Sequence, residues 1–516
     1  MKKFWEKWKR EVFIAFGIII LAVVLRLVNL HSLPVFTDEA IYVRWAQVMK
    51  ENAVFRFLPL TDGKQPLYMW IIIPFLKIFS NPLIAGRFVS AMSGVLTLVG
   101  VFVLTYLIFN SVKISLLSGL IYAISPFIVF FDRMALAGAT LSMFGIWTLI
   151  LSIITARKLR LDTAMLAGFA LGGAVLTKSP AIFFVLLSPL VILLVKWPKK
   201  TKEKALHLGK FILLWGVTLV IAYGFYNILR LGPEFHMIAI RNKDYIYPFS
   251  HLFTNPLDPF MPYFDRSIKW LWIMGPSSLL VLLLASPLLN IKKYFKEMVF
   301  LAACGIGPIL VQAEYAKIIT ARYIFFVLPY LCILAASVLL KKGKNIRKIL
   351  IAGLIVFVIH SLSTDYLILT NVEAVQLPRN ERAGYLEDWT SGGGIYEVSE
   401  LLREEWEKEP DAKIVVGTEG YFGTLPDGLQ IYLNNRKEIE VMGVGMTMAE
   451  VEPELLDSKI QGNKTYLVVN SSRFKGDAEE IGLKLLAVYP KAVKPDGSRD
   501  ALLFFEVTEK AIESKL

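Results

Sequence analysis

The sequence has few residues of the kinds that form disulfides or bind metals. Of its 516 residues only two are cysteine, Cys304 and Cys332, and both lie in apolar runs. A disulfide framework is therefore not expected. Five residues are histidine, scattered without the spacing of a zinc site; they are His31, His207, His236, His251 and His360. We accordingly expect no resident cofactor, although a divalent ion at a carboxylate stays an open alternative.

Charge is scarce as well. Only 19% of the residues are charged, 55% are hydrophobic, and the mean hydropathy is +0.55. A soluble protein of this size would not carry so many long apolar runs, so the composition indicates a polytopic membrane protein. The first run, Val12 to Leu30, is long enough to span a bilayer. Because it has no small-residue cleavage site, we expect an anchor rather than a signal peptide.

The net charge of +13 is unevenly distributed. Residues 371–516 contain 17 Lys and Arg against 27 Asp and Glu, a net −10, which leaves +23 on residues 1–370. A basic membrane part and an acidic tail predict two domains with these boundaries. The basic excess suits anionic lipid headgroups and a phosphate-bearing substrate. Nucleic acid is a poor alternative, because no basic, aromatic-studded soluble face is present.

About eleven apolar spans, and 11 to 13 transmembrane helices in all, are expected in the membrane domain. They lie near residues 12–30, 86–107, 114–131, 134–155, 164–179, 181–196, 210–229, 269–290, 298–314, 321–340 and 349–370. Basic clusters separate them, and the positive-inside rule puts these on the cytoplasmic side. The clusters are Lys2 to Arg10, Lys113, Arg157 to Arg160, Lys196 to Lys204, Lys292 to Lys296 and Lys341 to Lys348.

This alternation works only if residues 66–80 do not cross the bilayer. The segment is short, amphipathic and broken by Pro74, which favours an interfacial helix. The amino terminus is then cytoplasmic, and a cell-membrane location is expected. The outer side receives residues 31–85, Asp132-Arg133, the turn near Lys178, the loop 230–268 and everything after Thr370.

Beyond Thr370 the pattern is that of a soluble, extracytoplasmic α/β domain with a mainly parallel sheet. Strands are expected at residues 412–417, 439–444, 465–470, 484–488 and 501–507, and helices at 396–408, 428–434 and 449–459. Gly392-Gly393-Gly394 precedes a helix rather than following a strand. It is therefore a poor dinucleotide-binding fingerprint and is read as a linker or turn.

The first outer loop, residues 31–85, holds an adjacent acidic pair, Asp38-Glu39. One interpretation is structural, because Thr37 or Asp38 can cap a helix over residues 39–50 and acids are favoured in its first turn. The other is catalytic: an acid at the outer membrane face can take a proton from an acceptor hydroxyl or amine. Both interpretations stay open at this point.

The same loop holds Lys64, in the run Gly63-Lys64-Gln65-Pro66-Leu67-Tyr68-Met69-Trp70. A lysine in a loop is ordinarily solvated. Here Pro66 restricts the turn, and the aromatic residues after it anchor the segment at the membrane interface. A fixed ammonium at that place suits a lipid-linked phosphate.

Three further places carry charge beside apolar spans. Asp132-Arg133 forms either an ion pair or interfacial helix-end charges, or serves function. Lys178 either extends its ammonium to the interface or contacts phosphate. Arg322 either anchors the interface with Tyr323 or binds phosphate through its bidentate fork. Weaker candidates on the same predicted side are Arg241, Glu314 and Lys317.

Several cations on one face, near one acidic pair, favour an anionic substrate that approaches from outside. A nucleotide sugar fits poorly, since the charges face away from the cytoplasm. A polyprenyl-phosphate sugar fits better, because its tail lies in lipid and its phosphate at the interface. The phosphate is then the leaving group, stabilised by lysine and arginine.

The order of these motifs resembles that of the GT-C glycosyltransferases, specifically the protein O-mannosyltransferases and the lipid A aminoarabinose transferases. The likeness covers residues 1–370. It rests on Phe36-Thr37-Asp38-Glu39-Ala40, Gly63 to Tyr68, Gly86-Arg87-Phe88, Ser90-Ala91, Ser125-Pro126, Asp132-Arg133, Leu176-Thr177-Lys178, and Ala321-Arg322-Tyr323 with Pro329. Gln65 stands where the family commonly has a second proline. The carboxy-terminal domain matches neither branch.

The resemblance implies transfer of a sugar from a polyprenyl-phosphate donor to an extracytoplasmic protein, lipid or glycan, usually with inversion at the anomeric carbon. It implies catalytic roles for Asp38, with Glu39 beside it, and for Asp132 as a second acid. Lys64 would hold the donor phosphate, helped by Arg322, with Lys178 and Arg133 as further contacts. A divalent ion at Asp38 or Asp132 stays open.

Two other functions fit the sequence less well. A transporter or flippase of lipid-linked sugars predicts charged residues inside spans and two similar halves with interrupted helices, neither of which is clear in the sequence. A membrane-anchored sensor would leave Asp38, Lys64 and Arg322 without a role. A membrane glycosyltransferase is therefore the favoured prediction.

Overall fold

The structure is a computed structural model that describes residues 2–513, with side chains from Trp8 onward. Most of the side chains of the first basic cluster, Lys2 to Arg10, thus lie outside the described part. The chain forms two compact units. The membrane unit comprises residues 1–30, 53–71 and 87–378, and the sheet unit comprises residues 31–52, 72–86 and 379–516. The chain passes between the units at five points, whereas the sequence predicts a single boundary after residue 370.

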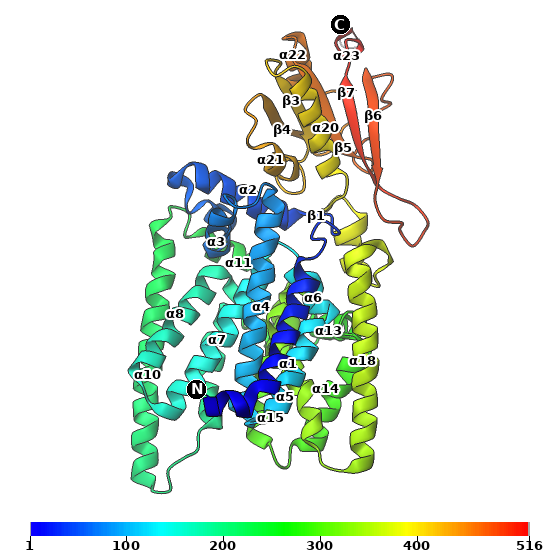
Figure 1. Ribbon diagram of the computed structural model, residues 1–516. Coiled ribbons are helices and arrows are strands. Elements are labelled where there is room, and N and C mark those ends of the chain that lie inside the picture. Colours follow the sequence, from blue (N-terminus) through cyan, green and yellow to red (C-terminus); the bar gives the residue numbers. More distant parts are fainter. Residues whose placement is uncertain (1, 514–516) are drawn as a thin grey trace. The chain divides into compact units, whose positions relative to one another are not determined.

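Each of the eleven expected spans coincides with helical structure in the membrane unit (Figure 1). The helices are α1 (Lys2–Leu27), α4 (Pro82–Phe109), α5 (Val112–Ile124), α6 (Pro126–Asp132), α7 (Ala137–Lys158), α8 (Leu161–Thr177), α9 (Ile182–Leu187), α10 (Thr201–Ile228), α13 (Phe260–Ile273), α14 (Ser277–Asn290), α15 (Phe295–Gly305), α16 (Gly307–Tyr315), α17 (Leu328–Ala336) and α18 (Lys344–Thr370). Between them lie α11 (Met237–Tyr245), α12 (His251–Thr254) and short 3-10 turns.

Fewer helices than the eleven expected spans are long, straight and apolar throughout. Within the described residues five are long and apolar enough to cross a membrane, and up to seven if each of two bent pairs counts as one span. The expected number near eleven is larger because three apolar stretches, Leu161–Thr177, Ser179–Leu194 and Phe325–Leu340, form shorter helices. Proline accounts for part of this: Pro180, Pro189 and Pro329 each remove a backbone donor in the last two stretches.

The expected span over residues 269–290 is a bent pair of helices rather than one continuous helix. Helices α13 and α14 meet there at 111°, around Gly275-Pro276. A proline cannot donate a hydrogen bond to the preceding turn, so the helix ends before it. The pair α5 and α6 is bent by 59° in the same way, at Ser125-Pro126. The two bends contact each other, since the Ser125 hydroxyl donates to the Gly275 carbonyl over 3.3 Å.

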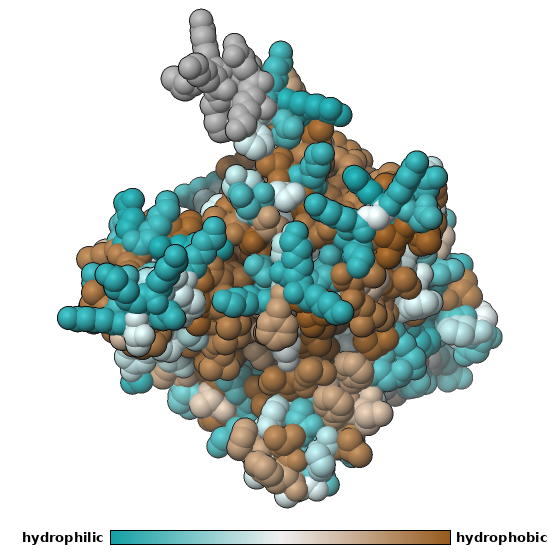
Figure 2. Space-filling view, turned by 90° about the horizontal axis from the view of Figure 1, so that it is seen from below, coloured by the Kyte–Doolittle hydropathy of each residue, from teal (hydrophilic) through white to brown (hydrophobic). Residues whose placement is uncertain are grey.

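Residues 66–80 form the short helix α3, Leu67–Phe75, with Pro74 inside it. Nine residues make a helix about 14 Å long, which is too short to span a bilayer. The structure thus contains a short helix at this place, and its position at the membrane interface stays a prediction. The basic loops at 196–204, 292–296 and 341–348 are exposed at the lower end of the membrane unit in Figure 1. Seen from below, this face carries projecting hydrophilic side chains around hydrophobic ones (Figure 2).

The sheet unit contains a five-stranded sheet of order β4-β3-β5-β7-β6. Its strands are β3 (Ile414–Glu419), β4 (Ile439–Gly445), β5 (Lys464–Asn470), β6 (Leu483–Pro490) and β7 (Ala501–Val507), so all five expected strands are present. The expected helices are present too, as α20 (Ile395–Lys408), α21 (Asp427–Leu433) and α22 (Pro453–Ile460). The last turn is α23 (Lys510–Glu513).

The sheet is mixed rather than mainly parallel. Strand β3 pairs with β4 and β5 in parallel, whereas β7 pairs with β5 and β6 antiparallel. A parallel pair needs a long crossover, which α21 and α22 supply. No helix of that length separates β6 from β7, and a short return gives an antiparallel pair. The core is formed by apolar residues of the strands and of α22, including Leu455, Leu467 and Phe505.

The sheet unit also contains the first outer loop. Strand β1, Val35–Phe36, pairs antiparallel with β2, Ser391–Gly392. Helix α2, Thr37–Glu51, then lies beside α21, where the Gln47 amide donates to the Ile431 carbonyl over 2.8 Å. Arg44 donates to Asn434. Residues nearly 400 positions apart therefore build one body.

Candidate active site

Lys64 follows a tight turn that favours glycine. The 3-10 helix η2, Leu58–Asp62, ends at Gly63, whose φ of +66° lies in the left-handed region. A Cβ atom at Gly63 would lie 2.7 Å from the Cβ atom of Arg241 and 2.9 Å from the Met237 carbonyl oxygen. A larger residue would therefore displace α11 as well as strain the backbone. The turn fixes the point from which Lys64 leaves the chain.

The Lys64 ammonium is held in an ion-pair network. Its Nζ lies 3.1 Å from Asp62 Oδ2, and Arg241 Nη2 lies 2.5 Å from the other oxygen of the same carboxylate. Arg241 also reaches Asp244, over 3.2 Å. The Lys64 side chain stays 26% exposed. Asp62 thus orients two cations, and the Lys64 side chain stays partly exposed.

Gln65, the residue that departs from the family pattern, joins this loop to the next cation. Its side-chain amide is 6% exposed and donates to the Ser179 hydroxyl over 2.9 Å. Ser179 directly follows Lys178. Gln65 therefore supplies through a hydrogen bond what a proline would supply through a restricted backbone, and it holds the Lys64 loop against the Lys178 turn.

Lys178 and Arg322 meet at Tyr323. The Lys178 Nζ lies 5.1 Å from the centre of the Tyr323 ring, and the Arg322 guanidinium carbon lies 5.7 Å from it. Both distances suit a cation–π contact. Lys178 and Arg322 are both half-buried.

Tyr245 connects this pair with Lys64. Burial raises the pKa of the Tyr245 hydroxyl, Tyr323 adds to the rise, and the positive charge of Lys64 opposes it. Tyr245 is thus within electrostatic range of both neighbours. Three of the four predicted phosphate-binding cations, Lys64, Lys178 and Arg322, therefore gather around two tyrosines, although they come from distant segments. We call this set the cation cluster.

The fourth predicted cation, Arg133, does not join the cation cluster. It is fully buried at the end of α6 and donates to three carbonyls at the end of α1: Leu25 over 2.9 Å, Val28 over 2.7 Å and Asn29 over 2.6 Å. Carbonyls left unpaired at a helix end need such donors. Arg133 is thereby occupied as a cap of α1.

Asp132 is also fully buried, and its Oδ2 lies 2.8 Å from Arg26 Nε, which is likewise inaccessible. Of the alternatives for Asp132-Arg133, the ion pair is therefore present, but the partner of Asp132 is Arg26 rather than Arg133. Gly94 makes this possible, because a Cβ atom there would overlap the Asp132 carboxylate. The catalytic role for Asp132 stays a prediction, and its complete burial favours a structural role.

Asp365 of α18 completes a buried group of charges. The residue is inaccessible to solvent, and both of its carboxylate oxygens lack a hydrogen-bond partner. Arg26 and Arg133 interact with it electrostatically. Arg87 is buried nearby, interacts electrostatically with Arg133, and donates to the Leu30 carbonyl over 2.5 Å. Charged residues inside the membrane unit thus hold α1, α4, α6 and α18 together.

Asp38 and Glu39 occupy different environments at the start of α2. The helix begins at Thr37, so the expected capping by the side chain of Thr37 or Asp38 is wrong. Glu39 is fully buried, and its Oε2 accepts the Phe36 backbone N–H over 3.0 Å, which is the third-position carboxylate of a capping box. Asp38 is half-buried. Only Asp38 therefore has an accessible surface for chemistry.

Thr37 anchors this helix start to the sheet unit. Its backbone N–H and its hydroxyl both donate to the Thr390 carbonyl, over 3.2 and 3.3 Å, and its hydroxyl lies 2.5 Å from that of Thr424. Trp45, further along α2, packs against Phe422 with ring centres 5.8 Å apart and the rings tilted by 31°. The loop 420–426, which follows β3, thus holds the start of α2 and positions Asp38.

Asp427 holds this loop, because its Oδ2 accepts the Gly423 N–H over 2.6 Å. Burial raises the pKa of Asp427 to about 6. A folded-state pKa above the unfolded value means that ionisation destabilises the fold, so stability is lost as pH rises from about 4 to about 6. We expect slower hydrogen exchange of the 420–426 amides, relative to their intrinsic rates, at pH 5 than at pH 7. Asp427→Asn should remove that difference, whereas an unchanged difference would contradict the assignment.

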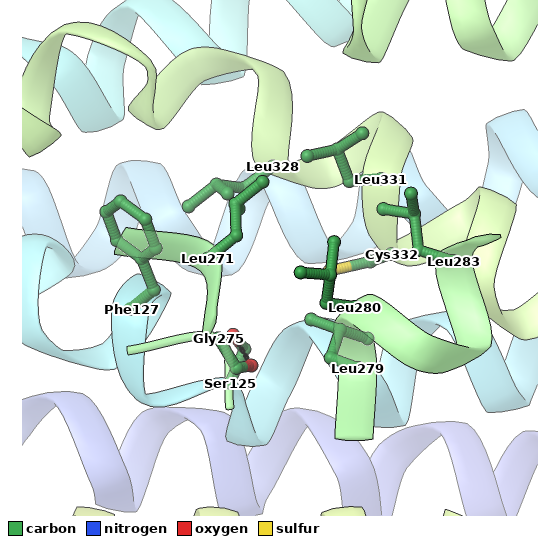
Figure 3. Close-up of a pocket in the computed structure, with 10 residues that line it drawn as sticks. All are labelled: Ser125, Phe127, Leu271, Gly275, Leu279, Leu280, Leu283, Leu328, Leu331 and Cys332. Atoms are coloured by element: carbon green, nitrogen blue, oxygen red, sulfur yellow. Dashed lines mark hydrogen bonds between the residues drawn. The ribbon is translucent and has the colours of Figure 1, made fainter. Parts of the chain in front are cut away.

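A separate pocket in the membrane unit is apolar. It lies at the two bends described above and is enclosed by side chains of α13, α14 and α17 (Figure 3). Leucines dominate its lining. Apart from Cys332, the lining residue with a polar side chain is Ser125. A pocket of this kind can take a hydrocarbon but offers nothing to stabilise a phosphate. This pocket is therefore not a candidate phosphate site, whereas the cation cluster and Asp38 stay candidates.

The described residues 2–513 contain no group of three or more His, Cys, Asp or Glu side chains placed to hold a metal ion. At Asp132, moreover, Arg26 pairs with one of the two carboxylate oxygens. Several contributors to the two charge groups were missed by the sequence prediction, namely Arg26, Asp62, Tyr245 and Asp365. Asp62 could have been identified from the sequence Thr61-Asp62-Gly63-Lys64, because an acidic residue lies there two positions before the lysine.

Part of the membrane unit matches a known protein family. A family model described as dolichyl-phosphate-mannose-protein mannosyltransferase matches residues 63–223, a stretch that includes Lys64 and Lys178. None of the curated proteins compared matches the sequence.

Solved structures share the fold over nearly the whole chain. ArnT from Cupriavidus metallidurans bound to undecaprenyl phosphate is similar with a TM-score of 0.57 and 16% identity, over 95% of this chain and 97% of that chain. ArnT in the apo state gives 0.56 and 15%, over 96% and 97%. The oligosaccharyltransferase AglB from Archaeoglobus fulgidus, in complex with an inhibitory peptide and a dolichol-phosphate, gives 0.50 and 13%, over 98% and 75%. The predicted fold is thus confirmed: this is a multi-pass α-helical membrane protein with a GT-C-like fold and a carboxy-terminal domain built on a β-sheet.

Proposed function

We propose that the protein is a membrane glycosyltransferase that transfers a sugar from a polyprenyl-phosphate donor to an extracytoplasmic acceptor. The observation that carries this proposal is the cation cluster. Lys64, Lys178 and Arg322 gather around Tyr323 and Tyr245, and Lys64 and Arg241 share one carboxylate. A gathering of half-exposed cations on a membrane unit suits a phosphate whose tail lies in lipid. The solved relatives ArnT and AglB, which hold undecaprenyl phosphate and dolichol-phosphate, support the same ligand class.

The reaction needs charge stabilisation at the leaving group and a base at the acceptor. As the acceptor oxygen or nitrogen bonds to the anomeric carbon, the bond from that carbon to the phosphate oxygen breaks. The phosphate leaves with the electron pair, and the cation cluster stabilises the developing charge. Asp38 takes the proton from the acceptor atom. Attack opposite the leaving phosphate inverts the anomeric carbon.

The orientation proposed from the sequence follows the charge distribution. The basic loops 196–204, 292–296 and 341–348 are assigned to the cytoplasm, together with the amino terminus. Asp38 and the acidic residues 371–516 are assigned to the outer side of the cell membrane. The donor is then used on the outer side. The predicted functional domains, residues 1–370 for transfer and residues 371–516 for the outer domain, belong to this proposal.

Donor cleavage tests the proposal directly. The purified protein is given polyprenyl-phosphate sugars in aqueous buffer, where water takes the sugar in place of the acceptor, and release of polyprenyl phosphate is followed for the wild type and for Lys64→Met. We expect the variant to lose about a hundredfold in kcat/KM, the scale of one lost charge-stabilising donor. Lys269→Met is the matched control, because Lys269 is an exposed lysine of α13 that pairs with Asp265. No cleavage of any donor by the wild type would favour a transporter, and equal losses in both variants would remove the special role of Lys64.

A further inference from the structure

The carboxyl ends of the parallel strands in the sheet unit gather polar side chains. From β3 the chain crosses to β4 on one side, whereas β5 lies on the other side and continues toward β6 and β7. The ends of β3 and β5 therefore flank a topological switch point, the place where open α/β sheets bind ligands. Glu419 ends β3 and Asn470 ends β5. Lys491 follows β6 and Asp500 precedes β7 at the same edge, since β7 runs antiparallel to β5 and β6.

These residues are buried and tied to one another. Glu419, 4% exposed, accepts the Asn470 backbone N–H and the Asn470 side-chain amide, each over 2.7 Å. The remaining atom of that amide, Asn470 Oδ1, is buried without a hydrogen-bond partner, and the residue is 1% exposed. A buried amide oxygen without a donor is costly to a fold. It marks a place where a ligand hydroxyl or a water would complete the bonding.

Hydroxyl and ammonium groups extend the same edge. Asp500 accepts the hydroxyls of Ser471 and Ser472, over 2.6 and 2.8 Å. Lys491 is 3% exposed, its Nζ donates to the Asp388 carbonyl over 3.0 Å, and burial lowers its pKa to about 8. Together these buried residues place hydrogen-bond donors and acceptors side by side rather than charges of one sign.

The charges at the edge balance. Arg473 lies 3.8 Å from Glu419, and Lys494 lies 3.4 Å from Asp388. With Lys491 and Asp500 the edge holds three cations and three carboxylates. A phosphate or an acidic peptide would need an excess of cations, and a metal or a basic peptide would need an excess of carboxylates. A neutral ligand rich in hydroxyl groups needs no excess of either charge, so it suits an edge whose charges balance.

Aromatic rings border this polar edge. Trp389 is 39% exposed, and the Arg473 guanidinium carbon lies 4.6 Å from its ring centre. Tyr421 and Phe422, in the loop after β3, are 66% and 48% exposed. Exposed rings beside planar polar side chains give a ligand both a hydrophobic face to stack on and partners for its hydroxyls. Sugar rings have those two kinds of surface.

The edge adjoins the start of α2. Thr390, the neighbour of Trp389, accepts the Thr37 N–H, and Thr424, close to Tyr421, contacts the Thr37 hydroxyl. Asp38 is the next residue along α2. In Figure 1, β7 runs toward α23, so β3 and β5 run the opposite way, toward α2. The polar edge and Asp38 therefore belong to one surface of the sheet unit.

We propose that this edge of the sheet unit, formed by Glu419, Asn470, Asp500, Lys491, Trp389 and Tyr421, binds a neutral carbohydrate, which is the acceptor that Asp38 deprotonates. That the ligand is the acceptor rests on the proposed transferase function. The argument for the binding site itself uses the sheet unit alone. It assigns the acceptor to the glycans rather than to unmodified peptides or to lipid headgroups.

Binding to the full chain in detergent tests the site without any donor. The probes are mannotriose, a serine-containing hexapeptide and glucosamine 1-phosphate, and the readout is saturation-transfer NMR with titration. Mannotriose should bind, and Trp389→Ala and Tyr421→Ala should each weaken it about tenfold, the scale of one lost stacking contact. Ile460→Ala removes a side chain that is 63% exposed at the opposite edge of the sheet, just before β5, and should bind as the wild type does. Thermal unfolding of each variant excludes a folding defect.

Binding of the peptide or the phosphosugar alone, binding of no probe, or equal mannotriose affinity in all variants would overturn the inference. Donor cleavage by the wild type is measured separately. If mannotriose binds through Trp389 but no donor is cleaved, the transferase proposal fails and the carbohydrate site stands. If donors are cleaved but mannotriose does not bind, the carbohydrate site alone fails.

Discussion

Asp38→Asn is expected to lower sugar transfer to the acceptor by a factor of about a hundred to ten thousand, the range for losing a general base. Asparagine keeps the size and the polarity of the side chain but cannot take a proton. Asp38 is half-buried at the first turn of α2, and Thr37 holds that turn to Thr390 and Thr424. The variant should therefore keep the fold and the donor affinity while losing kcat. Transfer is measured as labelled sugar on the acceptor at saturating donor.

Glu39→Gln is the matched control, because it removes a neighbouring negative charge. Its amide oxygen can still accept the Phe36 N–H that Glu39 accepts over 3.0 Å, so the capping box survives. We expect close to wild-type transfer. Glu39→Ala should instead cost about 1 kcal/mol of stability through the lost cap. A large loss of transfer in Glu39→Gln, with little loss in Asp38→Asn, would reverse the roles of the two acids.

Arg26→Met and Asp132→Leu should each destabilise the membrane unit by about 3 to 5 kcal/mol, the cost of leaving one buried charge without its partner. Both side chains are inaccessible, and their ion pair joins α1 to α6 over 2.8 Å. Neither side chain can reach water when its partner is removed. The effect is measured as a loss of thermal stability and of folded yield in detergent.

The double variant Arg26→Met with Asp132→Leu separates pairing from packing. Replacing both charges by apolar groups removes the desolvation penalty together with the attraction, so stability should return to within about 1 to 2 kcal/mol of the wild type. If the double variant is as unstable as the single ones, the pair is not what holds these helices. If it is stable but inactive with normal donor binding, Asp132 has the catalytic role that the sequence suggests.

The helices and strands followed closely from the sequence because their signals are local. Apolar runs of membrane length marked α4, α7, α10 and α18, and alternating or continuous apolar stretches marked all five strands of the sheet. The angle between α13 and α14 was not predictable in the same way. Pro276 shows that a helix must end, but the direction of the next helix depends on the residues against which it packs.

The candidate site was predictable in part for the same reason. Lys178 and Arg322 each lie beside apolar spans, and Lys64 precedes Pro66 and an aromatic segment, and these local contrasts identified them. Arg26 and Asp365 also interrupt apolar runs. Each is a single charge within one helix, however, and such a charge does not by itself indicate a function. Each matters because of a partner that is distant along the chain. Arg26, for example, pairs with Asp132, 106 positions further on. Such a pairing is a property of packing, which a single sequence does not contain.

The capping residue of α2 illustrates the opposite error. Thr37 and Asp38 are favoured N-cap types, and a helix beginning at Glu39 was the natural prediction. In the structure Thr37 bonds to Thr390 and Thr424 instead, so its hydroxyl is not available to α2. A tertiary contact outcompeted the local preference, and the helix starts two residues earlier.

The union of α2 with the sheet unit has a consequence for biosynthesis. Gln47 and Arg44 bond to residues 384 and 390 positions further along the chain. At about 5 to 20 residues per second, the ribosome needs about 20 to 80 seconds to make that stretch. Throughout this interval α2 is already synthesised but lacks the surface that holds it. The base that we assign to the reaction is therefore positioned only after nearly all of the chain has been made, so a prematurely terminated chain would be membrane-inserted but inactive.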